Sequence, residues 1–136
     1  MAAKLHTIIL NKDEDVTAGI HRFLMDKTWK AGIIVAAVGS IYDVTVGNPG
    51  SYEMPPKMLQ TTVNEPCEIV SFMGEITPKR DAPAGLPCQV TDTPSDYIVH
   101  IHMSSSQGEN ATVNGGGFRK ATVLRAINIY ALEIQD

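Results

Sequence analysis

The sequence predicts a single α+β domain, residues 1–136, with a largely antiparallel sheet of about seven strands and one main covering helix. Three observations lead to this prediction. The chain has 136 residues, 43% of them apolar, which is enough for one core but too little for two ordinary domains. One segment has the spacing of an amphipathic helix. The other apolar segments are short, rich in β-branched residues and mostly separated by turns, as strands are.

The chain is expected to open with a strand and a helix. Residues 4–10 are short and rich in β-branched side chains, which is typical of a strand. Residues 11–15 offer an N-cap and negative charge for a first helical turn. Gly32 would end the helix after Lys30, and the helix would cover one face of the sheet. Its apolar stripe consists of Val16, Ile20, Phe23 and Leu24.

The next segments predict several strands. Residues 32–39 form a continuous apolar run that is too short and too β-branched for a second helix, and this indicates a strand buried on both faces. Extended structure continues through residues 41–46, and residues 48–50 form a turn. Two further strands are predicted over residues 57–63 and 67–74.

Residues 77–96 change character, because they contain four prolines and little periodicity. A loop of this length inside a compact domain is usually functional or mobile. Regular structure returns with a strand over residues 97–104. Residues 115–117 are expected to form a glycine bend, and residues 123–134 a long final strand.

Charge and cysteine content exclude several classes of protein. Eleven basic and fifteen acidic residues give a net charge of −4, which disfavours a strongly basic nucleic-acid module. Two cysteines cannot make a disulfide framework; Cys67 is expected to be a buried small hydrophobe and Cys88 a loop thiol. The sequence has no signal-peptide pattern and no apolar run approaching the roughly 18 residues that span a bilayer. A soluble cytoplasmic protein without a membrane partner is therefore predicted.

The segment 97–103 contains the first candidate site. Side chains alternate along a strand, so His100 and His102 project from the same face. Two imidazoles about 7 Å apart at the backbone can converge on one divalent metal, although a catalytic zinc site needs a third protein ligand. Two solvated or hydrogen-bonded histidines on an outer face would explain the pattern equally well. The opposite, core-facing side consists of Tyr97, Val99, Ile101 and Met103.

Glu68 and three glycines are candidate ligand-binding residues. Gly115, Gly116 and Gly117 could let the backbone approach a ligand, but a turn that requires positive φ is the preferred interpretation. They do not form a phosphate loop, because no Gly-Lys-Ser/Thr follows. Glu68 lies in an apolar strand, where a carboxylate either has a partner or points to solvent. His21 is expected on the surface of the helix.

Several stretches, in order over nearly the whole chain, resemble the plants-and-prokaryotes conserved (PPC) domain in its bare prokaryotic form. Residues 36–40 resemble its early strand with a Gly-Ser/Ala bend, and residues 67–76 its Glu-Ile-x-Ser-Leu-x-Gly-x-Ile strand. Residues 99–104 and Gly108 resemble its His-x-His strand and turn. Residues 115–118 stand where the family has Gly-Gly-His-Leu.

The resemblance implies a fold and an assembly. PPC domains have an antiparallel sheet with a packed helix and assemble as homotrimers. In plants an AT-hook supplies the DNA contact, and the domain associates with itself and with other nuclear proteins. The fold is also similar to that of acetolactate decarboxylase, and in many bare domains three histidines look like a comparable metal site. This sequence has Gly117 in place of the third histidine, and it contains no AT-hook.

Two functions are therefore considered. The first is an oligomeric PPC-like binding module, DNA-binding or regulatory, which forms a homotrimer and contacts DNA weakly or other proteins. The alternative is a metal-dependent small-molecule enzyme with an acetolactate-decarboxylase-like fold, using His100, His102 and Glu68, with His21 or Cys88 as remote candidates for the missing ligand. The incomplete catalytic set favours the module. We accordingly predict no cofactor, and at most weak zinc binding at the two histidines.

Overall fold

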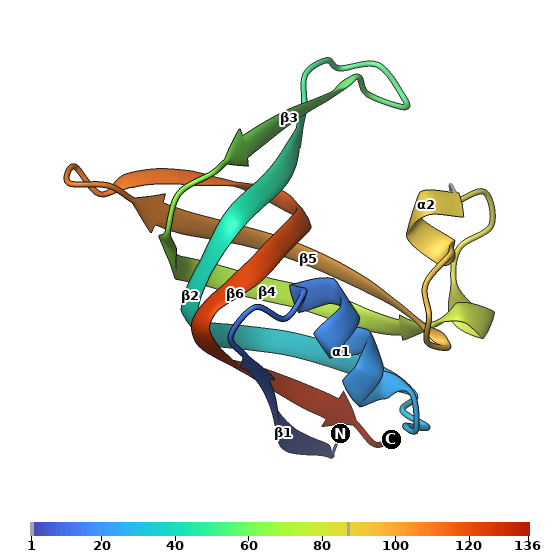
Figure 1. The fold of residues 1–136 in the computed structure, drawn as a ribbon. Helices are drawn as coiled ribbons and strands as arrows, with labels where there is room; N and C mark the ends of the chain where they lie inside the picture. The colour runs from blue at the N-terminus through green and yellow to red at the C-terminus, as the bar shows by residue number, and fades with distance from the viewer. Residues whose placement is uncertain (1, 87) are drawn as a thin grey trace.

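The structure, a computed structural model, describes residues 2–86 and 88–136, and of Cys88 and Gln89 it describes the backbone alone. Six strands dominate the fold (Figure 1). One helix of nine residues and two short helical turns complete it. In chain order the elements are β1 (Ala3–Asn11), α1 (Val16–Leu24), β2 (Ala31–Pro49), β3 (Met58–Val63), β4 (Cys67–Pro78), η1 (Lys79–Asp81), α2 (Cys88–Thr91), β5 (Tyr97–Gln107) and β6 (Thr112–Ile134).

The strands form one antiparallel sheet in the order β1-β6-β5-β4-β2-β3. The strand β2 also pairs with β6, from Ala31 opposite Ile134 to Gly47 opposite Gly117, so the sheet closes on itself. Figure 1 shows these two long strands bending around each other at the centre of the molecule. The predicted α+β class with a largely antiparallel sheet and one covering helix is confirmed.

The sheet has six strands among the described residues, not about seven, because the extended segments predicted over residues 32–39 and 41–46 belong to one strand, β2. The strand β2 continues through Gly39, where an added Cβ would lie 2.2 Å from the carbonyl oxygen of Ala126. The strand β6 continues through residues 115–117, so the predicted glycine bend is wrong. At Gly116 (φ +154°) an added Cβ would lie 2.6 Å from the side chain of Asn48. These glycines let neighbouring strands approach closely instead of turning the chain.

The helix α1 begins as predicted but ends earlier. The Asp15 side chain caps it by accepting the backbone N–H of Ala18 at 2.9 Å. The helix ends at Leu24 rather than at Lys30, which corrects the sequence-based boundary. The chain turns at this point because the following residues carry Trp29, which is 3% exposed, into the core.

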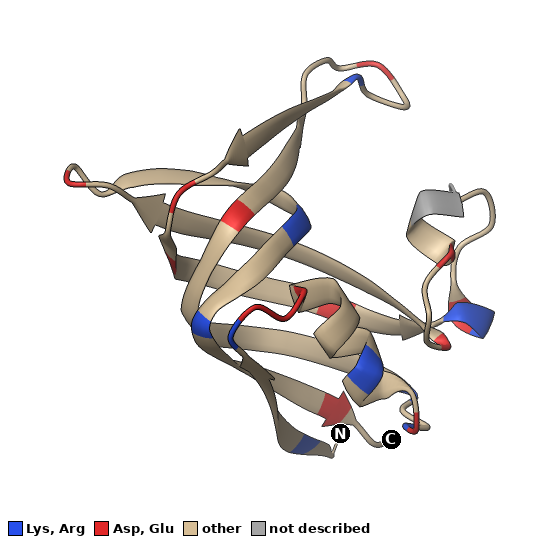
Figure 2. Cartoon of the chain, in the orientation of Figure 1, with Lys and Arg blue, Asp and Glu red and all other residues tan. Residues whose placement is uncertain are grey.

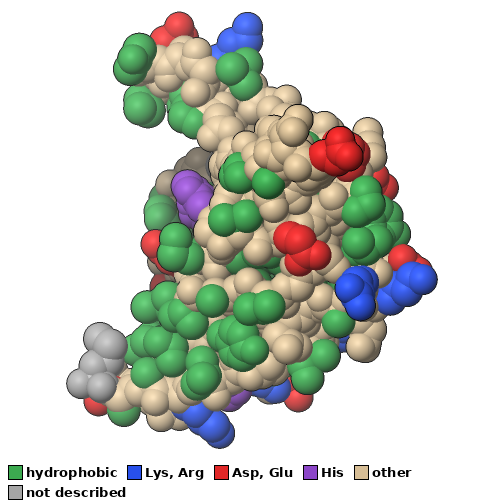
Figure 3. Space-filling model, turned by 90° about the vertical axis from the view of Figure 1, so that its left-hand side faces the viewer, with side chains coloured by type: hydrophobic (Ala, Val, Ile, Leu, Met, Phe, Trp, Pro, Cys, Tyr) green, Lys and Arg blue, Asp and Glu red, His purple; other side chains and the backbone are tan. Residues whose placement is uncertain are grey.

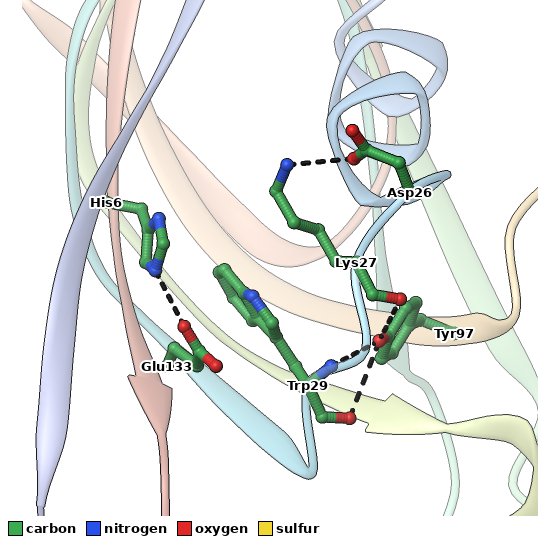
Figure 4. A network of polar contacts seen from close by, with 6 residues as sticks. All are labelled: His6, Asp26, Lys27, Trp29, Tyr97 and Glu133. Carbon is green, nitrogen blue, oxygen red and sulfur yellow. Dashed lines mark hydrogen bonds and ion pairs between the residues drawn. The ribbon is translucent and has the colours of Figure 1, made fainter.

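A network of polar contacts fixes this turn to the sheet (Figure 4). The Tyr97 hydroxyl accepts the backbone N–H of Trp29 at 2.6 Å and donates to the carbonyl oxygen of Lys27 at 2.9 Å. On the other side of the indole, the His6 ring lies 4.7 Å from the Trp29 ring, centroid to centroid. His6 Nε2 also lies 2.9 Å from Glu133 Oε1. The first strand, the turn and β5 are therefore joined around one aromatic side chain.

The prediction that residues 32–39 are buried on both faces is wrong. Ile34 and Ala37 face the core, whereas Ile33, Val35 and Val38 are 44%, 41% and 65% exposed. The hydrophobic core covers one side of β2 only. The apolar run therefore reflects a strand with one face in the core and one apolar face left open.

The segment between β4 and β5 folds back on itself. It contains η1 and α2, and its ends are joined by a 2.9 Å hydrogen bond from the Lys79 N–H to the Asp96 carbonyl. The Lys79 ammonium also donates to the carbonyl of Thr93 at 2.8 Å. No helix within the described residues is long and apolar enough to cross a membrane.

Candidate functional site

His100 and His102 lie side by side on the outer face of β5. Both are exposed, while on the opposite side Tyr97, Ile101 and Met103 are buried as predicted and Val99 is only partly buried. The Nε2 atoms of the two histidines are 3.2 Å apart, and the rings meet edge to face at 76°. One ring must donate and the other accept, so at least one imidazole is neutral in this contact.

The histidines border an open groove of about 500 Å3 across three strands. The strand register places Met73 opposite His102 and Glu75 opposite His100, with Ile33 of β2 opposite Glu75. Aliphatic side chains from β2 and β4 supply the floor. We call this surface the β2–β4–β5 face and define it by Ile33, Val35, Met73, Glu75, His100 and His102.

The PPC resemblance places a third metal ligand at position 117, and this position faces the histidine pair. Gly117 of β6 is the register partner of His102. An added Cβ at Gly117, however, would lie 3.0 Å from Nη1 of Arg119, so a guanidinium occupies the adjacent space. A fixed positive charge there disfavours a divalent cation. Within the described residues, no group of three or more His, Cys, Asp or Glu side chains is placed to hold a metal ion. The residues present do not fit a three-ligand metal site.

Glu68 and the three glycines lie at different places along the sheet. Glu68 is exposed on β4 opposite Ser106, beside a shallow groove of about 210 Å3 whose lining does not include the glycines. The Gly115 carbonyl accepts a hydrogen bond from Asn48 Nδ2 at 2.9 Å. Gly115 itself pairs with Ser104 of β5. Ligand binding by Glu68, Gly115, Gly116 and Gly117 stays a prediction.

His21 is the functional candidate that the sequence placed wrongly. It is 2% exposed rather than on the surface, and its Nδ1 lies 2.7 Å from Ser95 Oγ. Burial, and secondarily the positive charge of Lys79, hold the pKa of His21 below its ordinary value. The helix periodicity could not reveal this, because the covering residues come from a segment more than 70 positions away.

The two cysteines differ in what the structure shows. Cys67 is 3% exposed, as predicted, and burial raises the pKa of its thiol, which makes it an unreactive core residue. Cys88 belongs to α2, and its side chain is outside the described residues.

We predict that Gly117→His will raise zinc affinity about tenfold or more, because it places an imidazole opposite His102. Adding Arg119→Gln should raise the affinity further by removing the neighbouring positive charge. Calorimetric zinc titration of the metal-free proteins measures both effects. Gly108→His is the control, since a side chain at Gly108 meets nothing within 4 Å.

The wild-type protein, purified without an affinity tag, is expected to be largely metal-free by elemental analysis, and His100→Ala to leave folding nearly unchanged. Stoichiometric zinc that disappears on His100→Ala would contradict this expectation.

The fold and the site together define a class of protein: an antiparallel sheet closed on itself, one helix over its core, and a His-x-His pair on the outer face. The sequence matches the Plants and Prokaryotes Conserved (PCC) domain over residues 1–135. The chain therefore belongs to this family, which confirms the resemblance to PPC domains.

Solved structures agree with this assignment. A plant- and prokaryote-conserved (PPC) protein of Pyrococcus horikoshii is similar with a TM-score of 0.74 at 17% identity, covering 98% of this chain and 80% of that one. A metal-containing protein of Archaeoglobus fulgidus has a TM-score of 0.73 at 24% identity, covering 96% and 79%. A protein of Bacteroides thetaiotaomicron described as putative DNA-binding has a TM-score of 0.69 at 17% identity, covering 97% and 82%. At these identities the likeness shows the shared fold. No curated protein matches the sequence significantly.

Proposed function

We propose that this chain is a self-associating binding module of the PPC family, which assembles as a homotrimer and contacts DNA or regulatory proteins as an assembly. One observation carries the proposal: the β2–β4–β5 face is open and exposes adjacent apolar side chains beside Glu75 and the two histidines. Ile33, Val35 and Met73 on this face are 44%, 41% and 57% exposed. A contiguous apolar surface of this kind usually marks an interface.

The geometry of the face suits self-association. Figure 3 shows hydrophobic side chains gathered on one side of the molecule, with a histidine beside them. Cyclic closure would bury the face in every copy at once, which a monomer cannot do. The number three comes from the family resemblance, and the open face supplies the contact surface.

Size-exclusion chromatography with light scattering tests the assembly. At micromolar concentration we expect a mass of three times the 14.7 kDa chain. A monomer mass under these conditions would remove the basis of the proposal.

DNA binding by this chain is expected to be weak and strongly dependent on salt. Kinship with the Bacteroides thetaiotaomicron protein supports a DNA contact, but the net charge is −4. Figure 2 shows Lys and Arg scattered over the strands, the helix and the loops rather than gathered into one stripe. Few phosphates can then be neutralised by each chain, although a trimer multiplies the contacts.

Fluorescence anisotropy with duplex DNA measures this prediction. We expect affinity to fall steeply between 50 and 200 mM salt, as counterion release requires. Nanomolar binding near physiological salt would show that the charge argument is wrong.

A further inference from the structure

A cavity of about 630 Å3 lies beneath the segment that joins β4 to β5. Figure 1 shows this segment, with α2, standing off the sheet where β4 ends and β5 begins. The volume and the mainly apolar lining match small-molecule sites, which enclose about 300–1,000 Å3 and carry a few placed polar groups. The apolar lining comes from four parts of the chain and includes Ile20, Leu86, Val90, Ile98, Ile101 and Phe118.

The strand order leaves this space open. The strand β5 pairs with β6 only through residues 102–107. Residues 97–101 of β5 pair with β4 on one edge, while β6 turns away after Gly117 to pair with β2. Among the residues that the structure describes, no strand fills the resulting gap, so the strand topology itself leaves the cavity.

Arg119 supplies a positive charge at the cavity wall. Phe118 and Lys120 pair with consecutive residues of β2, which leaves Arg119 as the extra residue of a β-bulge. Its guanidinium lies against Gly47 and Gly117, where glycine leaves room for it. No carboxylate of the described residues forms an ion pair with Arg119. A planar guanidinium of this kind suits bidentate contact with a carboxylate.

His21 adds a polar side chain to the lining of the same cavity. Ser95 Oγ accepts the backbone N–H of Tyr97 at 3.2 Å and lies 2.7 Å from His21 Nδ1. A neutral imidazole that accepts at Nδ1 carries its hydrogen on Nε2. When Ser95 donates to Nδ1, His21 therefore offers an Nε2 hydrogen.

The charges around the cavity favour an anion. Arg119 lines it, and Lys79 is close enough to act on His21. Glu75 is the opposing charge in the lining, and its side chain is exposed to water. Lys79 does not line the cavity, and water screens the exposed Arg119 and Glu75 alike, so the preference for an anion rests on the Arg119 guanidinium, with which no described carboxylate forms an ion pair.

We propose that this cavity binds a small monocarboxylic acid with an apolar body, the carboxylate on Arg119 and the body among the aliphatic side chains beneath the β4–β5 segment. The cavity shares Glu75 and His100 with the β2–β4–β5 face, whereas Arg119 and the aliphatic lining beneath the β4–β5 segment lie outside that face.

Calorimetric titration with hexanoate tests the proposal, with acetate, hexanol and hexylamine as comparison probes. Hexanoate should bind at least about tenfold more tightly than each of the others, because acetate lacks the body and the other two lack the negative charge. Arg119→Gln should weaken hexanoate binding about tenfold or more. Leu86→Asp should weaken it similarly by placing a negative charge in the apolar lining.

Arg125→Gln is the matched control, since Arg125 is an exposed arginine of the same strand outside the cavity lining. It should leave hexanoate affinity unchanged. Circular dichroism verifies folding of each variant, and light scattering reports assembly separately, so a failed trimer and a failed cavity are distinguishable. Equal affinity for hexanoate, hexanol and hexylamine, or equal weakening by Arg119→Gln and Arg125→Gln, would overturn the proposal.

Discussion

Replacing Val35 by glutamate will convert the proposed trimer into a monomer. Val35 is 41% exposed on the β2–β4–β5 face, and Glu75 already places a carboxylate there. Association would bury the new carboxylate at position 35 in every interface, close to the carboxylate of Glu75. Burying a charge without a partner is strongly unfavourable. We expect the association constant to fall about 100-fold or more, with each tenfold step worth about 1.4 kcal/mol.

Light scattering over a concentration series measures the change, and circular dichroism shows whether the fold persists. Met25→Glu is the matched control, because Met25 is 58% exposed at the end of α1, outside the proposed contact. It should remain a trimer. A Val35→Glu protein that keeps the trimer mass would place the interface elsewhere.

Replacing Phe72 by alanine will lower the free energy of unfolding by about 3–5 kcal/mol. Phe72 is 2% exposed on β4, and its ring packs edge to face against Phe118 of β6 at 5.8 Å between centroids. Truncation removes the buried surface and leaves a cavity that the paired strands cannot close. The loss is a large part of the roughly 5–15 kcal/mol that stabilises an ordinary domain.

Urea unfolding in the Val35→Glu background measures this loss without a contribution from association. Met73→Ala is the control, because Met73 is the next residue on the same strand but is 57% exposed. It should cost within about 0.5 kcal/mol, as surface substitutions usually do. Equal losses for the two variants would contradict the assignment of Phe72 to the core.

Local patterns were enough to predict the residues whose placement depends on their own element. The Asp15 cap and the buried positions Val16, Ile20 and Leu24 agree with the sequence because a helical repeat fixes one face. The shared face of His100 and His102 agrees because side chains alternate along any strand.

Predictions failed where a distant segment determines the environment. The glycines at 115–117 were predicted to form a bend, but they lie within β6, where the close approach of Asn48 explains Gly116 and that of Arg119 explains Gly117. His21 was predicted on the surface, but Ser95, 74 positions later, covers it. The end of α1 was placed too late because Trp29 is drawn into the core beside His6. None of these contacts leaves a periodic signal in its own segment.

The sequence by itself determined the fold class, the family, the helix stripe and the paired histidines, since these follow from composition, motif order and repeats of 3.6 and two residues. Only the tertiary structure decided which apolar face of β2 stays open, where Arg119 lies relative to Gly117, and that a cavity remains between β5 and β6. The physical reason is that hydrophobicity determines which side chains are driven to leave water, whereas long-range strand pairing determines which of them become buried.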